Sequence, residues 1–209
     1  MPKITDISIQ KNNKTRANVN IDGEFAFGLE MLTVMKLGLK IGQEVSEQRL
    51  KEAVLDSEKT VALEKAMNYI GRGRKTNRQM REYLEKKGYD NEIVQYVLGK
   101  MKYYGYVDDH AYAVAYAEQN MQTKGARRIR QELLQKGISV AEAEAQSAQD
   151  SDVSRKNAAR LAEKYMKNKP RDLKTLQKLQ RYLVSRGYDF DCVNSVVRIY
   201  RTDDEPLFD

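Results

Sequence analysis

Arginine and lysine are the residues whose types and spacing indicate chemistry in this sequence. Residues 72 to 87 hold seven of them against two glutamates, residues 124 to 136 hold five against one, and residues 171 to 186 hold five against one acid. These windows hold 17 basic and 4 acidic residues in a chain of net charge +7, so the remainder is acidic overall. Guanidinium and ammonium groups bind phosphates and carboxylates, and arginine does so in a bidentate manner. The pattern therefore predicts contact with an anionic partner.

Twelve of these cations are candidate contacts with a partner or with DNA: Arg72, Arg74, Lys75, Arg78, Arg81, Lys124, Arg127, Arg128, Arg130, Lys174, Lys178 and Arg181. At 100° per residue, the last three fall within roughly a 60° arc opposite a leucine stripe. A charged helix face is often merely solvated, but a basic helix face is expected in all three of the basic windows.

Tyrosines accompany the basic windows. The rings that could stack on nucleic-acid bases are those of Tyr83, Tyr103, Tyr104 and Tyr106. The alternative interpretation is that these rings pack between helices with their hydroxyls in water.

Catalytic and cofactor motifs are not found. Gly71 to Lys75 is too short for a phosphate-cradling GxxxxGK[ST] loop, and no GxSxG, HExxH or CxxC occurs. His110 lies beside Asp108 and Asp109, but a helix cap explains this group better than a metal site, because adjacent positions diverge on a helix. We expect a protein that is not an enzyme and has no cofactor.

The positioning elements are predicted to be helices in a repeat. The segments YLEKKGY, ELLQKGI and YLVSRGY each place a leucine four residues before a glycine, at Gly88, Gly137 and Gly187. Those glycines are 49 and 50 residues apart, which indicates one supersecondary unit used three times. Three units of three helices would form an elongated array, in which each unit contacts mainly its neighbours.

Helix starts follow from capping residues. Two helices are predicted to begin at Ser46 and Ser57. Capping boxes are predicted for Thr76 with Gln79 and for Ser139 with Glu142. Acidic residues or serine are expected to begin the other helices, at Asp90, Asp108 or Asp109, Ser151 or Asp152, Asp172 and Asp189. The third helix of the second unit is expected to extend from Ser139 to about Gln149.

Residues 4 to 29 alternate in the manner of β-strands, with a break at Asp22-Gly23 that is typical of a hairpin. We therefore predict a mainly α protein with a small N-terminal β-hairpin element. The expected divisions are 1–56 (β-element and short helices), 57–107, 108–150 and 151–201 (three-helix repeats) and 202–209 (acidic tail).

Composition favours a protein of the reducing cytoplasm, and we expect it to be a monomer. The single cysteine, Cys192, cannot form an internal disulfide, and no apolar run approaches the ~20 residues of a membrane span. The N-terminal segment lacks the apolar core of a signal peptide.

Three segments carry a resemblance to a known family. Gly105-Tyr-Val-Asp-Asp109, the alanine and tyrosine segment after it, and the stretch from Lys124 to Ile138 resemble the RecX family of bacterial regulators of the RecA recombinase. Two departures are Tyr112, where the family usually has phenylalanine, and a single glycine, Gly125, where it typically has Gly-x-Gly.

The resemblance implies tandem three-helix units that bind the RecA filament on single-stranded DNA. It also implies inhibition of RecA ATP hydrolysis and strand exchange, in recombinational repair and the SOS response. The alternative is a helix-turn-helix-like protein that acts directly on duplex DNA. Such readers usually dimerise to match two half-sites, and three unequal tandem units lack that symmetry.

Overall fold

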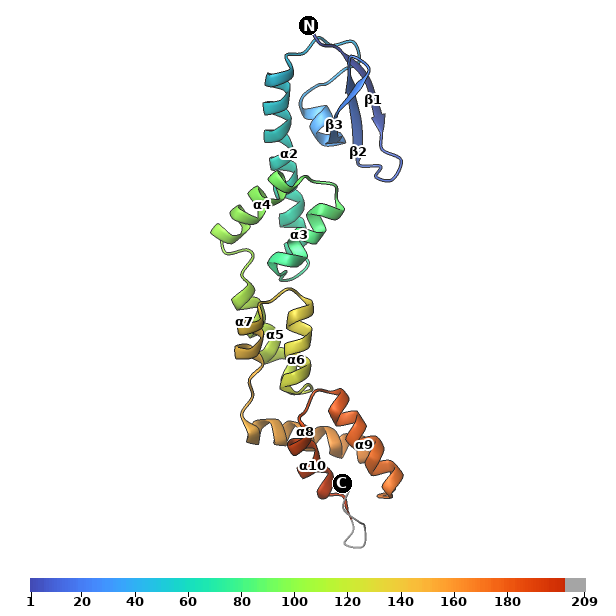
Figure 1. Cartoon of the computed structure of the whole chain (residues 1–209), viewed down its shortest axis with the longest axis vertical. Coiled ribbons are helices and arrows are strands. Elements are labelled where there is room, and N and C mark those ends of the chain that lie inside the picture. The colour runs from blue at the N-terminus through green and yellow to red at the C-terminus, as the bar shows by residue number, and fades with distance from the viewer. Residues whose placement is uncertain (202–209) are drawn as a thin grey trace. The chain divides into compact units, whose positions relative to one another are not determined.

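A computed structural model describes residues 1–201, apart from the side chains of Glu47 and Arg49 (Figure 1). The chain divides into two compact units, one ending at Val107 and the other beginning at Asp108. The predicted acidic tail, 202–209, lies outside the described residues.

The first unit begins with a three-stranded antiparallel sheet in the order β1 (Ile4–Ile9), β2 (Arg16–Ile21) and β3 (Glu24–Glu30). The expected hairpin at Asp22-Gly23 is present, because both residues take positive φ angles of 49° and 87°. The sheet is too small to be stable alone, and it packs against helices. Its core contains Ile4, Val19 and Leu29.

Two helices follow, α1 (Met31–Lys36) and α2 (Glu47–Ile70). The prediction that Ser57 starts a separate helix is wrong, because α2 continues through it, and the predicted boundary between residues 56 and 57 lies inside this helix. Leu50 and Val54 pack on the sheet, whereas Ala62 and Ala66 pack in the core of the next domain. Packing at both ends therefore overrides the weak preference of serine for a cap.

The first three-helix domain is completed by α3 (Asn77–Lys86) and α4 (Asn91–Tyr103). The predicted capping box is confirmed: Thr76 Oγ1 accepts from Gln79 N at 3.2 Å, and Gln79 Oε1 accepts from Thr76 N at 3.1 Å. Asp90 precedes α4 without a side-chain cap bond.

The second unit contains two further three-helix domains. The second domain consists of α5 (Asp109–Asn120), α6 (Ala126–Gln135) and α7 (Val140–Ser147). Asp108 caps α5 by accepting from Ala111 N, and Ser139 caps α7 by accepting from Glu142 N. The last helix ends at Ser147, two residues earlier than expected.

The third domain consists of α8 (Ser151–Met166), α9 (Leu173–Ser185) and α10 (Phe190–Arg198). Helix α8 begins at Ser151, one of the two expected starts, but its capping side chain is that of Asp150, which accepts from the amides of Asp152 and Val153. The caps predicted at Asp172 and Asp189 are confirmed.

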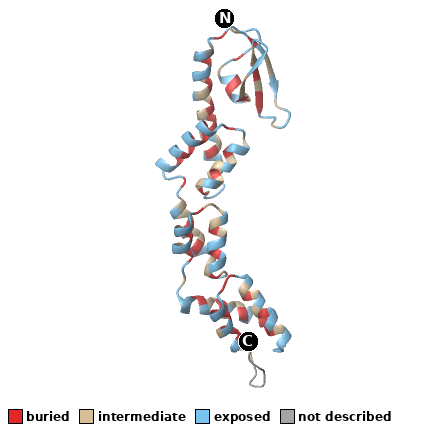
Figure 2. Ribbon diagram, in the orientation of Figure 1, coloured by how far each residue is buried: buried red, intermediate tan, exposed pale blue. Residues whose placement is uncertain are grey.

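The repeat closes in the same way three times. Gly88, Gly137 and Gly187 have φ angles of 86°, 86° and 90°, in the left-handed region that terminates a helix after α3, α6 and α9. The fold prediction of three three-helix domains after a small antiparallel β-element is therefore confirmed. Buried and exposed residues separate onto opposite sides of many of the helices (Figure 2).

Candidate functional site

The middle helix of each domain positions the candidate cations. Apolar residues at matching positions are fully buried in the three middle helices: Met80 and Leu84 in α3, Ile129 and Leu133 in α6, and Leu179 and Leu183 in α9. Because these residues fix the buried stripe of each helix, the intervening basic residues point to solvent.

In the first domain, the candidate arginines of α3 have partners in their own helix. Arg78 Nε lies 2.7 Å from Glu82 Oε1, and Arg81 NH1 lies 3.8 Å from Glu85 Oε1. Such surface pairs contribute about 0–1 kcal/mol, so a stronger anion can displace the glutamates.

Three more candidates of this domain lie just before α3. Arg72 and Arg74 are exposed, and Lys75 Nζ lies 4.9 Å from the centroid of the Tyr69 ring. The ring holds this ammonium group in place without removing its charge. Tyr69 in turn stacks on Tyr83, at 4.0 Å between centroids, so Tyr83 packs between helices.

In the second domain, Glu132 gathers two candidate cations. Lys124 Nζ lies 2.6 Å from Glu132 Oε2, Arg128 Nε lies 2.7 Å from Oε1, and Tyr116 donates its hydroxyl to Oε2 at 2.6 Å. Burial by itself would raise the pKa of Glu132, but the three hydrogen bonds outweigh it and lower the pKa to about 2. Lys124 and Arg128 thus share one carboxylate that stays ionised, which offsets part of their charge.

The other two candidates of α6 differ from each other. Arg130 NH2 lies 2.6 Å from Glu144 Oε1 of α7. Arg127 is exposed, and within residues 1–201 it has no ion pair with a described carboxylate. Arg127 therefore retains its charge for a partner.

The third domain leaves its candidates most available. Lys174 and Lys178 are exposed on α9, and both interact electrostatically with Asp172, the capping residue. Hydrogen bonds from Thr175 lower the pKa of Asp172, and the two lysines lower it further. Arg181 donates from Nε to the Gln177 carbonyl at 3.4 Å. The expected basic face opposite Leu176 and Leu179 is therefore present.

Three of the tyrosines predicted as stacking partners form an exposed group at the end of α4. Tyr103 is 82% exposed, Tyr104 61% and Tyr106 48%. The rings of Tyr103 and Tyr104 are edge-to-face at 5.1 Å. These rings are accessible to a base, unlike that of Tyr83.

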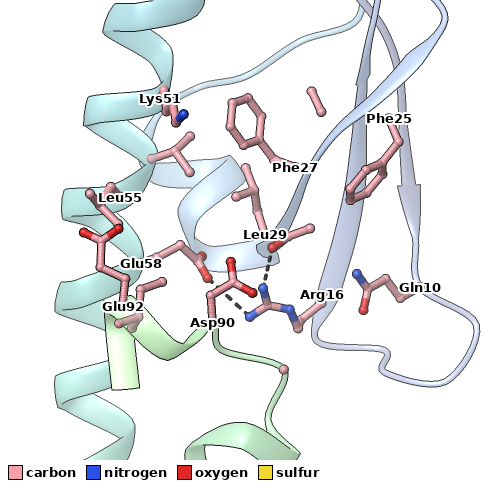
Figure 3. A pocket seen from close by; sticks show the side chains of 15 residues that line it. Gln10, Arg16, Phe25, Phe27, Leu29, Lys51, Leu55, Glu58, Asp90 and Glu92 are labelled. Atoms are coloured by element: carbon pink, nitrogen blue, oxygen red, sulfur yellow. Dashed lines mark hydrogen bonds and ion pairs between the residues drawn. The ribbon is translucent and has the colours of Figure 1, made fainter. Parts of the chain in front are cut away.

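Sequence reasoning missed a buried ionic cluster between the sheet and α2 (Figure 3). Arg16 NH1 lies 3.3 Å from Glu30 Oε1 and 3.2 Å from Glu58 Oε2, and NH2 donates to the Gly28 carbonyl. Lys65 Nζ lies 2.8 Å from the other oxygen of Glu30. These residues are far apart in sequence and none of them belongs to a motif, so the sequence alone could not reveal the cluster.

This cluster borders a pocket of about 400 Å³. Glu58 also accepts from the Glu30 amide at 2.9 Å and from the Thr33 hydroxyl at 2.6 Å. Because both carboxylates are paired with cations and hydrogen-bonded, the arrangement anchors the β-element to α2. Burial and the two glutamates raise the pKa of the neighbouring Tyr89 hydroxyl.

His110 makes a contact between helices. Its Nδ1 lies 2.7 Å from Glu142 Oε1 at the start of α7. In the described part of the chain, no group of three or more His, Cys, Asp or Glu residues is arranged to hold a metal. None of the helices in that part has the length and apolar character that crossing a bilayer requires.

Family models match the chain along most of its length. The model of the regulatory protein RecX N-terminal domain matches residues 2–46, and models of the first, second and third RecX three-helix domains match residues 62–101, 108–145 and 155–197.

Relatives and a solved structure agree with these matches. A "Regulatory protein RecX" of Clostridium botulinum (strain Alaska E43 / Type E3) is 34% identical over 95% of this chain and 96% of its own length. One of Clostridium perfringens (strain 13 / Type A) is 32% identical over 95% and 96%. The structure titled "Crystal structure of regulatory protein RecX" has a TM-score of 0.64 at 27% identity, and covers 94% of this chain and 98% of its own. The chain belongs to the RecX family of regulatory proteins.

Proposed function

We propose that this chain binds the RecA filament on single-stranded DNA and lowers RecA's ATP hydrolysis and strand exchange, as a regulator of recombinational repair and the SOS response. One observation carries the proposal: a RecX-family chain repeats a basic middle helix in each of three domains. The chain acts by binding, without a chemical step of its own, and it works in the cytoplasm as a monomer.

Repetition suits a filament, because the partner also repeats. A chain with three similar domains can contact an assembly at more than one place, and linked contacts raise the overall affinity above that of each alone. Each domain therefore needs only a weak site, which agrees with cations that lie on exposed helix faces.

The cations divide into two groups by their charge balance. Arg127, Lys174 and Lys178 have no ion pair with a described carboxylate, so they are the first candidates for contact with DNA phosphate or an acidic surface of RecA. Arg78 and Arg128 must first exchange a glutamate for the partner's anion. We expect the first group to contribute more to binding per residue.

Co-sedimentation tests the proposal. RecA filaments on single-stranded DNA, RecA without DNA, and DNA alone are each incubated with the chain and pelleted. The proposal predicts that the chain pellets with the filament, and that a variant carrying R127Q, K174Q and K178Q pellets less while its helicity is unchanged. The matched control carries K11Q, K14Q and K40Q, at exposed lysines outside the three basic helices. Equal loss in the two variants would remove the basic faces from the proposal.

The alternative is a sequence-specific reader of duplex DNA, which the basic middle helix of each three-helix domain favours. It predicts a footprint on a defined duplex site, with protection of base edges in the major groove. Binding to random duplex and single-stranded DNA without such a footprint would reject the alternative.

A further inference from the structure

The second and third domains meet through backbone hydrogen bonds. The start of α6 lies against the turn that follows α9 (Figure 1). Gly125 N donates to the Arg186 carbonyl at 3.0 Å, and Arg127 N donates to the Gly187 carbonyl at 3.3 Å. The free amides of one helix start thereby satisfy the free carbonyls of another helix end.

The same junction is held by α8. Asn157 Nδ2 donates to the Met121 carbonyl at 3.0 Å, and Arg160 NH2 donates to the Gln122 carbonyl at 2.9 Å. The turn that leads into α6 is therefore fixed by two elements of the third domain, so side chains around it are held in a defined arrangement.

Two pockets open at this junction and share Tyr182 and Arg186. One has a volume of about 550 Å³ and the other about 350 Å³. Among the described residues that line them there is no aspartate or glutamate. The lining cations come from the turn before α6, from α6 and α8, from the turn after α8, and from the residue that follows α9: Lys124, Arg128, Lys164, Lys167, Lys169 and Arg186.

Aromatic rings hold two of these cations. Tyr165 and Tyr182 stack at 4.9 Å, Lys169 Nζ lies 3.3 Å from the Tyr165 centroid, and Arg186 Cζ lies 5.1 Å from that of Tyr182. A ring positions a cation but does not neutralise it as a carboxylate does. Within residues 1–201, Lys167, Lys169 and Arg186 have no ion pair with a described carboxylate, in contrast to Lys124 and Arg128.

We propose that this junction is a binding site for the phosphate backbone of single-stranded nucleic acid. Its lining is basic and holds no described acidic residue, and lysine and arginine are among the side chains that contact nucleic-acid phosphates. A flexible strand can place a phosphate in a depression between domains, whereas a rigid duplex presents a convex surface. Cations beside aromatic rings are also characteristic of single-strand binding surfaces.

The site does not depend on the proposed regulation of RecA, because it predicts that the chain alone binds nucleic acid. Four of the six cations are lysines, which bind phosphate as point charges. An acidic protein segment is the competing occupant, and the experiment distinguishes it from a nucleic acid.

The test is fluorescence anisotropy with a labelled oligothymidylate and the full chain, without RecA. The variant carries K167Q, K169Q and R186Q, all at exposed side chains whose backbone contacts are retained. The control carries K11Q, K14Q and K40Q, which removes the same charge from the first unit. Circular dichroism checks that both variants keep the helicity of the parent chain.

Three lost phosphate contacts should reduce the slope of log affinity against log salt by about 2, since each contributes about 0.7 on single strands. At ~0.1 M salt this corresponds to a loss of about a hundredfold, whereas the control should change by less than about threefold. Equal affinities for the two variants would overturn the proposal. It would also be overturned if an oligoglutamate peptide displaced the oligonucleotide at equal charge concentration.

Discussion

The contact between Gly125 and Gly187 gives the sharpest stability prediction. A Cβ at Gly125 would lie 2.3 Å from the Gly187 oxygen, 2.4 Å from its carbonyl carbon and 2.5 Å from Tyr188 N. All three are backbone atoms, so no side chain can rotate away. Gly125 has φ −77° and ψ 165°, which alanine adopts readily, so the substitution Gly125→Ala tests packing and not backbone strain.

The expected loss in the free energy of unfolding follows from the contacts that the added methyl group would disturb. Overpacking costs about 1–3 kcal/mol. Separation of the two domains also breaks the hydrogen bonds from Gly125 N and Arg127 N, at about 0.5–1.5 kcal/mol each. We therefore expect Gly125→Ala to lower the free energy of unfolding of the second unit by about 2–6 kcal/mol.

Urea denaturation followed by circular dichroism measures this change, and amide hydrogen exchange at Arg127 locates it. Gly99→Ala is the matched control: a Cβ there meets nothing within 4 Å, and alanine inside α4 should stabilise by about 0.5–1 kcal/mol. If both variants were at least as stable as the parent chain, the packed junction would be refuted.

Three further predictions concern other parts of the chain. Arg16→Met leaves two buried carboxylates without their shared partner and should lower the stability measured by thermal unfolding by about 3–5 kcal/mol. Lys14→Met, at an exposed position, should change the stability by no more than about 0.5 kcal/mol. Equal losses would contradict the buried cluster. The pKa of Glu132 falls from 4.5 to about 2 on folding, so its ionised form stabilises the folded chain by at most about 3 kcal/mol. This contribution is present above pH 4.5 and is lost as the pH falls towards 2. The stability difference between the parent chain and Glu132→Gln should therefore shrink over that range, and a constant difference would reject the assignment. Asp189→Ala should cost about 1 kcal/mol by removing the 2.7 Å cap bond to Cys192 N, whereas Asp189→Asn should cost less than half of that in the same urea titration, and equal losses would argue against a cap.

Local signals were sufficient for the helical repeat. Capping at Thr76, Asp172 and Asp189 and the three positive-φ glycines depend on residues within one turn, so their sequence patterns predict them. Ser57 misled the prediction because a serine inside a helix carries the same local signal as a cap, and only packing at both ends of α2 decides between them.

The candidate site was predictable only in part. The exposed faces of α6 and α9 follow from the 3.6-residue period, which places Arg127 and Lys178 opposite buried leucine and isoleucine positions. The helical period does not predict which of the exposed cations are paired with carboxylates, because Glu144 contacts Arg130 from a different helix. The pocket that Lys169 and Arg186 line could not be predicted from the helical period either, because only folding brings these two residues together.

RecA's single-stranded-DNA-dependent ATP hydrolysis, measured while the full chain is titrated in, tests the central claim most directly. The account predicts that hydrolysis falls at near-equal or substoichiometric ratios of chain to RecA from the matched species. It also predicts that the variant carrying R127Q, K174Q and K178Q requires a higher concentration for the same effect. Hydrolysis that stays unchanged at every ratio, with the chain folded, would contradict the account.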